Sequence, residues 1–310
     1  MLSSSESSLL SNVRARLPAR IETVARQFDH RRDRLGSHDA LLRESARRML
    51  ERLDYIRLAP RRILDVGCGL GRCRTGLLGR YRDASWTGIE LSESLAGAGR
   101  TEQRRGLGFA RLWREVPRWI VADGARLPVA DDSVDLVFSN LMLHWHPAPH
   151  LVLPEWKRVL RVDGLLMFSC FGPDTLVELR TAVAATLPRA SPMPFVDMHD
   201  FGDMMVASGF ATPVMDVERL TLTFASAAAV LAEVRALGGN PRDDRPAALP
   251  SGRQARSLLR ALDAQRNTEG RIPLTFEIAY GHAWKPPARD LRVNTVSLER
   301  LHERVSHERK

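Results

Sequence analysis

Apolar residues recur along the chain with two different spacings, and each spacing predicts a kind of element. Between residues 41 and 57 they lie three and four positions apart, which is the period of an amphipathic helix on a core. From residue 62 on, short apolar runs alternate with helical patterns across glycine-rich or charged turns. This part of the sequence predicts strands at 62–66, 85–89, 117–121, 134–138 and 165–171, with helices between most of them.

After residue 172 the helical pattern dominates. We expect helices at 174–187, 200–208, 226–237 and 251–264, and two further strands at 214–224 and 274–284. Strands that alternate with helices form mostly parallel sheets covered on both faces. The sequence thus predicts an α/β, Rossmann-like fold: a mostly parallel seven-stranded sheet with helices on both faces, an N-terminal helical cap and a helical insertion before the last strand.

Composition narrows the classes of function. Hydrophobic residues make up 44% of the 310 residues, but no run approaches the roughly 18 apolar residues of a membrane helix. The N-terminal residues lack the pattern of a secretory signal, and the three cysteines lack metal-site spacing, so we expect a cytoplasmic protein without a structural metal. The formal charge of +9 would attract nucleic acid or an acidic protein, or it reflects genome composition alone.

The strongest local motif is the segment ILDVGCGLG at 63–71. An apolar strand leads directly into Gly67, Gly69 and Gly71, where the backbone can turn tightly and approach a ligand. Dinucleotide-binding proteins carry GxGxxG around a pyrophosphate, whereas here Asp65 precedes the glycines. A carboxylate repels a phosphate and suits an ammonium group. S-adenosylmethionine (SAM) has an ammonium and no phosphate, so the motif, with Cys68 inside it, indicates a SAM site.

Three further motifs follow at the ends of successive predicted strands. Glu90, with Leu91 after it, lies 23 positions after Gly67 and would accept hydrogen bonds from the ribose hydroxyls. The segment Asp123-Gly124-Ala125 offers a carboxylate to the adenine amino group, and Asn140 would close the pocket around the methionine part. Each motif alone is compatible with an ordinary turn. Four of them in order at carboxyl ends of strands predict a class I SAM-dependent methyltransferase domain, which we place at 61–286.

Segments outside this core carry a narrower resemblance. GPDTLVELR at 172–180, MHDFGD at 198–203, PVMDVERLTLTF at 213–224, ALGGN at 236–240 and FEIAYGHAWKP at 276–286 resemble the malonyl-[acyl-carrier protein] O-methyltransferases of biotin synthesis. This resemblance implies SAM as cosubstrate, no metal, a malonyl-loaded acyl-carrier protein as partner, and no nucleic acid or membrane. The cap of that family carries a Phe and then a Tyr about seven residues on; Phe28 matches, and Leu35 stands in place of the Tyr.

Other functions remain open at this level. Methyltransferase-like proteins that assist respiratory complex I assembly, described as arginine hydroxylases, share part of the same pattern. A SAM-binding scaffold without methyl transfer and a small-molecule methyltransferase, for example of quinones, also fit the SAM motifs. The intact GPDTL, MHD and GHAW segments favour the carrier-protein enzyme.

The implied substrate suggests its own site residues. A malonyl carboxylate is already ionised at neutral pH, so the enzyme needs an arginine to hold it rather than a general base. We expect Arg180 to hold it because it lies just past the fifth predicted strand, and His144 to belong to the catalytic site because it follows the fourth. Arg253, Arg256 and Arg260 share one face of the predicted 251–264 helix and would dock an acidic carrier protein.

These expectations divide the chain into regions. We predict a flexible tail at 1–20, the helical cap at 21–60, the SAM-dependent methyltransferase domain at 61–286 with a helical lid at 238–270, and a charged tail at 287–310.

Overall fold

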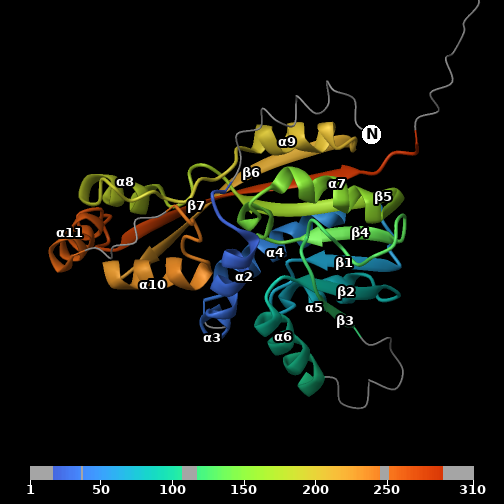
Figure 1. The fold of residues 1–310 in the computed structure, drawn as a ribbon, viewed down its shortest axis with the longest axis horizontal. Coiled ribbons are helices and arrows are strands. Elements are labelled where there is room, and N and C mark those ends of the chain that lie inside the picture. The colour runs from blue at the N-terminus through green and yellow to red at the C-terminus, as the bar shows by residue number, and fades with distance from the viewer. Residues whose placement is uncertain (1–16, 36–37, 107–116, 245–250, 289–310) are drawn as a thin grey trace, which may run out of the picture.

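The structure, a computed structural model, describes residues 17–35, 38–106, 117–244 and 251–288. Within these ranges seven strands form one sheet in the order β3-β2-β1-β4-β5-β7-β6 (Figure 1). The first five strands are parallel, and β7 runs antiparallel to both β5 and β6. The strands are β1 (Arg62–Val66), β2 (Ser85–Glu90), β3 (Arg118–Val121), β4 (Val134–Ser139), β5 (Leu160–Phe171), β6 (Ala211–Phe224) and β7 (Ile272–Trp284).

Helices cover both faces of this sheet and continue beyond its end (Figure 1). They are α2 (Ile21–Asp29), α3 (Arg32–Leu35), α4 (Ala40–Arg52), α5 (Arg72–Arg80), α6 (Glu93–Gly106), α7 (Pro149–Val159), α8 (Val177–Thr186), α9 (Met198–Ala207), α10 (Ala227–Leu237) and α11 (Gly252–Asp263), with 3-10 turns η1 (Leu53–Tyr55) and η3 (Leu143–Trp145).

The central strands are buried on both sides, which is why their sequences are almost continuously apolar. Along β1, Ile63 belongs to the core cluster shared with α4 and α5, whereas Leu64 belongs to the cluster shared with α7 and α9. Successive side chains of a strand point to opposite faces, so one short strand contributes to both cores. The predicted fold class is confirmed: a mostly parallel seven-stranded sheet between helical layers, with its carboxyl ends carrying the predicted motifs.

The antiparallel strands β6 and β7 form a hairpin that extends past the rest of the sheet. Strand β7 pairs with β5 only from 278 to 284, and its residues 272–277 pair with β6 alone. Helices α8 and α10 pack on these two strands, and α11 packs on both helices. We call the four elements together, α8, α10, α11 and the extended hairpin, the distal lobe; in Figure 1 it lies apart from β1–β4.

Three predicted boundaries shift for local reasons. The helix expected at 174–187 begins at Val177, because Leu176 has a positive φ of 59° and its N–H donates to Thr275 O. The helix expected at 41–57 ends at Arg52 and continues as the 3-10 turn η1. Strand β5 begins at Leu160 rather than 165, because Leu160 pairs with Val134 before the register shifts.

Candidate cofactor and substrate site

The turn after β1 brings bare backbone to the floor of a pocket at the carboxyl ends of the strands. Gly67, Gly69 and Gly71 have φ values of 72°, 54° and 70°, a region that residues with a β-carbon adopt only under strain. A β-carbon on Gly67 would lie 2.2 Å from Met142 Cγ, and one on Gly71 would lie 2.5 Å from the Trp119 ring. Glycine is therefore required at both positions for a steric reason as well as a conformational one.

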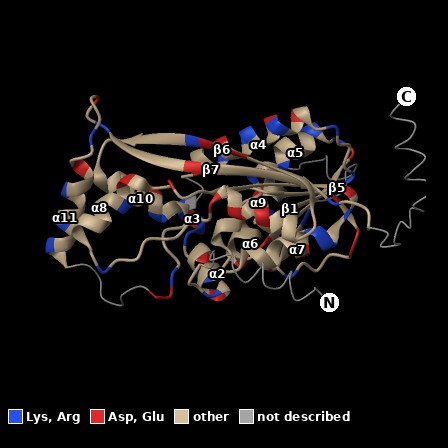
Figure 2. Cartoon of the chain, turned by 90° about the horizontal axis from the view of Figure 1, so that it is seen from above, with Lys and Arg blue, Asp and Glu red and all other residues tan. Residues whose placement is uncertain are grey.

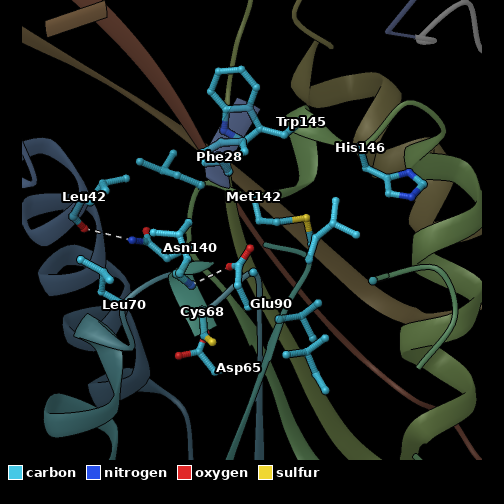
Figure 3. A pocket seen from close by; sticks show the side chains of 18 of the residues that line it. Phe28, Leu42, Asp65, Cys68, Leu70, Glu90, Asn140, Met142, Trp145 and His146 are labelled. Carbon is cyan, nitrogen blue, oxygen red and sulfur yellow. Dashed lines mark hydrogen bonds between the residues drawn. The ribbon is translucent and has the colours of Figure 1, made fainter. Parts of the chain in front are cut away.

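Two buried carboxylates lie beside this turn (Figure 3). Asp65 is 1% exposed and its Oδ2 has no hydrogen-bond partner among the described residues. Burial raises the pKa of Asp65 to about 7, and the nearby Glu90 adds to the shift. A buried carboxylate oxygen without a partner is destabilising, so a cationic group of a ligand would relieve it.

Glu90 is held by the backbone rather than by another side chain. Its Oε2 accepts a hydrogen bond from Gly69 N at 2.8 Å, and its Oε1 accepts one from Ser92 N at 2.9 Å. Burial raises the pKa of Glu90, although these hydrogen bonds act in the opposite direction. Each oxygen keeps lone pairs for a further donor, and a vicinal diol such as that of ribose supplies two such donors.

At the end of β3, Asp123 is fixed by a histidine that sequence reasoning did not identify. Asp123 Oδ1 accepts from Ala125 N at 2.9 Å and pairs with His146 Nε2 at 3.1 Å. His146 Nδ1 accepts from Ala148 N, so Nε2 carries the proton and donates to Asp123. Burial acts to raise the pKa of Asp123, but the hydrogen bonds from His146 and Ala125 outweigh it and lower the pKa.

Asn140 connects the end of β4 to the helix layer. Its Nδ2 donates to Leu42 O of α4 at 2.9 Å, and its Oδ1 accepts from Ser169 Oγ of β5 at 2.9 Å. The next residue, Leu141, has a positive φ of 52°, which is strained for a branched side chain. Strain of this kind persists where surrounding contacts impose it, and here Asn140 and Leu141 both line the pocket.

Helix α2 forms part of the pocket wall. Ile21, Val24 and Phe28 line it, and Phe28 meets the ring of Trp145 edge to face with centroids 5.3 Å apart. Asp29, at the end of α2, accepts from Ser92 Oγ at 2.5 Å, which ties the helix to the start of α6. The spacing of Ile21, Val24 and Phe28 is helical and was a readable signal in the sequence. The side chain of Leu35 lies outside the described residues.

An ion pair between Asp39 and Arg72 also lines the pocket, and no sequence motif predicted it. Asp39 Oδ2 lies 3.3 Å from Arg72 Nε and 2.7 Å from a guanidinium nitrogen of Arg43. Arg72 is the first residue of α5, immediately after the glycine turn. Asp39 and Arg72 line the pocket together with Asp65, so an ammonium and a carboxylate of one ligand would both meet opposite charges there.

Most of the predicted SAM residues converge on this pocket. Those that line it are Asp65, Gly67, Cys68, Gly69, Glu90, Leu91, Asp123, Gly124 and Asn140. Gly71 and Ala125 are not among the lining residues. Gly71 precedes the first residue of α5, and Ala125 N donates a hydrogen bond to Asp123. The burial of Cys68 raises the pKa of its thiol, which keeps it an uncharged part of the wall.

The predicted substrate residues do not converge in the same way. Arg180 is exposed on α8, its guanidinium donates to Pro173 O, and it does not line the pocket. Arg253, Arg256 and Arg260 are exposed on α11 in the distal lobe. His144 is buried beside the pocket, with its ring 4.9 Å from that of Trp145, which lines it. Of these predicted substrate residues, His144 alone lies next to the pocket.

The residues present fit SAM. Asp65 offers an unpaired buried oxygen for the ammonium, Glu90 offers two oxygens for the ribose diol, and Asp123 offers one to the adenine amino group. Gly69 also lines the pocket, and no atom of the described residues lies within 4 Å of the place that a β-carbon would take there, so a ligand can approach this part of the backbone.

No group of three or more His, Cys, Asp or Glu side chains among the described residues is arranged to hold a metal ion. No helix in the same ranges combines the length and the apolar composition needed to cross a membrane.

Comparison with solved structures bears on the fold alone. The YcgJ protein from Bacillus subtilis aligns with a TM-score of 0.56 at 17% sequence identity, covering 79% of this chain and all of that protein.

Comparison of sequences reaches further. Residues 64–168 match a family described as a methyltransferase domain. The malonyl-[acyl-carrier protein] O-methyltransferase of Laribacter hongkongensis is 44% identical over 87% of this chain and 91% of its own length. The enzyme of that name from Halorhodospira halophila is 42% identical over 90% and 92%. This chain is a SAM-dependent methyltransferase, and it belongs to the family of malonyl-[acyl-carrier protein] O-methyltransferases.

Proposed function

We propose that this enzyme transfers the methyl group of SAM to the free carboxylate of a malonyl group carried by an acyl-carrier protein, as a step of biotin synthesis. One observation carries the proposal: the similarity to enzymes of that name spans about nine tenths of the chain. The general methyltransferase domain accounts only for residues 64–168. The similarity therefore extends beyond the general methyltransferase domain, into the cap and the distal lobe.

The pocket supports the cosubstrate part of the proposal. Asp65, Glu90 and Asp123 would hold the ammonium, ribose and adenine groups, while α2 covers the pocket and excludes water. When bound, SAM supplies a methyl group on a positively charged sulfur, which an oxygen nucleophile can attack. The chain's task is to hold the substrate carboxylate in line with that methyl group, at roughly 3–3.5 Å.

No proton needs to move in this reaction. A carboxylate with a pKa near ~4 is ionised at neutral pH, so its oxygen is already a nucleophile. The new bond joins this oxygen to the methyl carbon while the bond from that carbon to sulfur breaks and its electron pair stays on sulfur. Histidine residues near the pocket are thus expected to orient groups rather than to accept a proton.

The distal lobe is the proposed docking surface for the carrier protein. Arg253, Arg256 and Arg260 lie three and four positions apart on α11 and are exposed, while Leu262 of the same helix is buried. Figure 2 shows basic residues, in blue, along α11. The helix begins with a capping box in which Ser251 and Gln254 satisfy each other's backbone N–H groups, which stabilises the first turn of the helix that carries the arginines. An acidic carrier protein would be attracted to such a surface, and its long flexible arm would carry the malonyl group toward the pocket.

A genetic experiment tests the proposed function as a whole. A bacterial strain that lacks its own malonyl-[acyl-carrier protein] O-methyltransferase and needs added biotin should grow without biotin when it expresses this chain. The variant Glu90→Ala, expressed at the same level, should fail to support growth because it loses SAM affinity. If the unmodified chain is produced in folded form and growth still requires biotin, the proposal is wrong, and the hydroxylase, scaffold and small-molecule alternatives return.

A further inference from the structure

Two histidines lie two residues apart after β4, and their hydrogen bonding differs. Both nitrogens of His146 are engaged, one with Asp123 and the other with Ala148 N. His144 Nδ1 accepts a hydrogen bond from Phe171 N at 3.2 Å, whereas its Nε2 has no hydrogen-bond partner among the described residues. Since His144 is only 4% exposed, water does not take the place of that partner at the surface.

The hydrogen bond from Phe171 N to Nδ1 determines whether Nε2, the nitrogen without a partner, is a donor or an acceptor. A backbone N–H must be accepted by an unprotonated ring nitrogen, so the proton of neutral His144 lies on Nε2. Burial keeps the ring neutral, because it lowers the pKa of His144 to about 3. His144 therefore presents a neutral N–H donor that nothing satisfies, and buried donors are almost always satisfied in native proteins.

The position of this donor points to a ligand. His144 lies at the carboxyl end of β4, where open α/β sheets bind their ligands. Three aromatic rings surround it: Trp145, which lines the cofactor pocket, Phe171 at the end of β5, and Phe195, with centroids 4.9, 4.4 and 6.0 Å away. Phe195 belongs to the coil before α9 and is only partly buried, so it forms the outer wall of this aromatic cluster.

We propose that the Nε2–H of His144 donates a hydrogen bond to the thioester carbonyl oxygen of the malonyl substrate. This inference rests on the proposed function and names the group that orients the substrate in the same site. The malonyl arm enters between Trp145 and Phe195, and its carbonyl oxygen accepts the hydrogen bond from His144 Nε2–H. The two apolar rings flank the methylene group between the carbonyl and the carboxylate.

The chemistry favours a neutral donor at this position. A charged imidazolium would pair with the substrate carboxylate and make its oxygens poorer nucleophiles. A neutral N–H on the thioester carbonyl fixes the malonyl group at one end and leaves the carboxylate free to react. His144 keeps its proton throughout, because methyl transfer to an ionised carboxylate neither takes up nor releases one. Turnover should consequently show no titration of this residue between pH 5 and 8.

Two variants separate the proposed contact from packing. His144→Phe removes both the donor and the acceptor, whereas His144→Gln has an amide oxygen for Phe171 N and an amide N–H for the substrate. His199→Gln is the matched control, because His199 is exposed on α9 and outside the pocket lining. We expect kcat/KM with malonyl carrier protein to fall roughly ten-fold for the Phe variant. The Gln variant should recover most of the wild-type kcat/KM. Affinity for S-adenosylhomocysteine should stay unchanged in all three.

The outcomes are decisive in both directions. Wild-type turnover by His144→Phe overturns the inference, and so does an equal loss of turnover in the Phe and Gln variants. A proton NMR readout is independent of catalysis: the Nε2–H resonance of His144 should shift downfield when malonyl-pantetheine is added to the complex with S-adenosylhomocysteine. An unmoved resonance at saturating ligand contradicts the contact. If the wild type makes no methyl ester, the proposed function fails, and this resonance alone decides whether His144 meets a malonyl thioester.

Discussion

The part of the molecule that contains the parallel strands and the pocket, here called the cofactor half, differs from the distal lobe in how the order of residues in the chain relates to their positions in space. In the cofactor half, the predicted cofactor residues that line the pocket lie at or close to the ends of β1, β2, β3 and β4, whose carboxyl ends meet at one edge of a parallel sheet. In the distal lobe, helices α8 and α10 pack on an antiparallel hairpin, α11 packs on these two helices, and the chain between the two strands of the hairpin runs from residue 225 to residue 271. Position in the chain predicts position in space in the first region and not in the second.

This difference explains which residues the sequence could locate. Asp65, Glu90, Asp123 and Asn140 each lie at or next to the carboxyl end of a parallel strand, so topology alone brings them together. Arg180 also follows a strand, but the turn at 172–176 is tied to β7 by Leu176 N and Thr275 O and carries α8 toward α11.

The glycine turn should tolerate change least. Gly67→Ala places a β-carbon 2.2 Å from Met142 Cγ at a positive φ, so we expect a loss of about 2–5 kcal/mol in the free energy of unfolding and little remaining SAM binding. Gly69→Ala is the control, because its φ is also positive but no atom lies within 4 Å of the added carbon. Urea denaturation and calorimetric titration measure both quantities. Equal destabilisation of the two variants would mean that contact with Met142 is unimportant.

Glu90→Ala should weaken SAM binding by about 1–3 kcal/mol, because it removes acceptors for the ribose and leaves Gly69 N and Ser92 N without their partner. Glu93→Ala is a suitable control, since Glu93 is exposed on the neighbouring helix. Isothermal titration calorimetry of the folded variants gives the affinities. Unchanged affinity in Glu90→Ala would remove the residue from the site.

Asp65→Asn should change how stability depends on pH. The folded pKa of about 7 lies above the ordinary value of 3.8, so between these values the folded state holds a proton that the unfolded state has lost. Stability of the unliganded protein therefore falls as pH rises through this window, and Asn removes that contribution. We expect the variant to be more stable than the wild type by at least about 1 kcal/mol at pH 8, and similar near pH 4.

Thermal and urea unfolding at several pH values, without SAM, measure this effect. The same variant should bind SAM more weakly, because the ammonium loses its carboxylate partner. Parallel stability curves for Asp65→Asn and the wild type would show that Asp65 titrates normally despite its burial.

In the distal lobe, charge should matter more than shape. Reversing Arg253, Arg256 and Arg260 to Glu should raise KM for malonyl carrier protein several-fold and leave turnover of a short malonyl thioester unchanged. Added salt should weaken the wild-type preference for the carrier protein, since the Debye length is about 10 Å at 0.1 M. Steady-state kinetics with both substrates provide the measurement. Wild-type kinetics of the triple variant with the carrier protein would place docking elsewhere.

The smallest effect is expected at Arg180. Its side chain is exposed and donates to Pro173 O, so Arg180→Ala should retain SAM affinity and nearly full methyl transfer. A large loss of turnover with SAM affinity intact would instead support the sequence-based assignment of Arg180 to the substrate carboxylate. In that case the 172–180 segment must move toward the pocket during the reaction.

Sequence patterns were sufficient for the fold and for most of the residues that line the candidate cofactor pocket. They missed Asp39, Arg72 and His146 for a common reason: each acts through a partner that is distant in the chain, such as Arg72 on Asp39 and His146 on Asp123. The idle nitrogen of His144 is likewise invisible in the sequence, because it depends on which neighbour occupies Nδ1. Contacts of this kind follow from tertiary packing and not from spacing.

The most direct measurement follows both products of one reaction. Purified protein is mixed with SAM and malonyl carrier protein, and mass spectrometry records the carrier protein while S-adenosylhomocysteine is quantified. We predict a gain of one methyl group on the malonyl moiety, sensitive to esterase, with S-adenosylhomocysteine formed in equal amount. A protein that binds SAM tightly and forms neither product contradicts the proposed function.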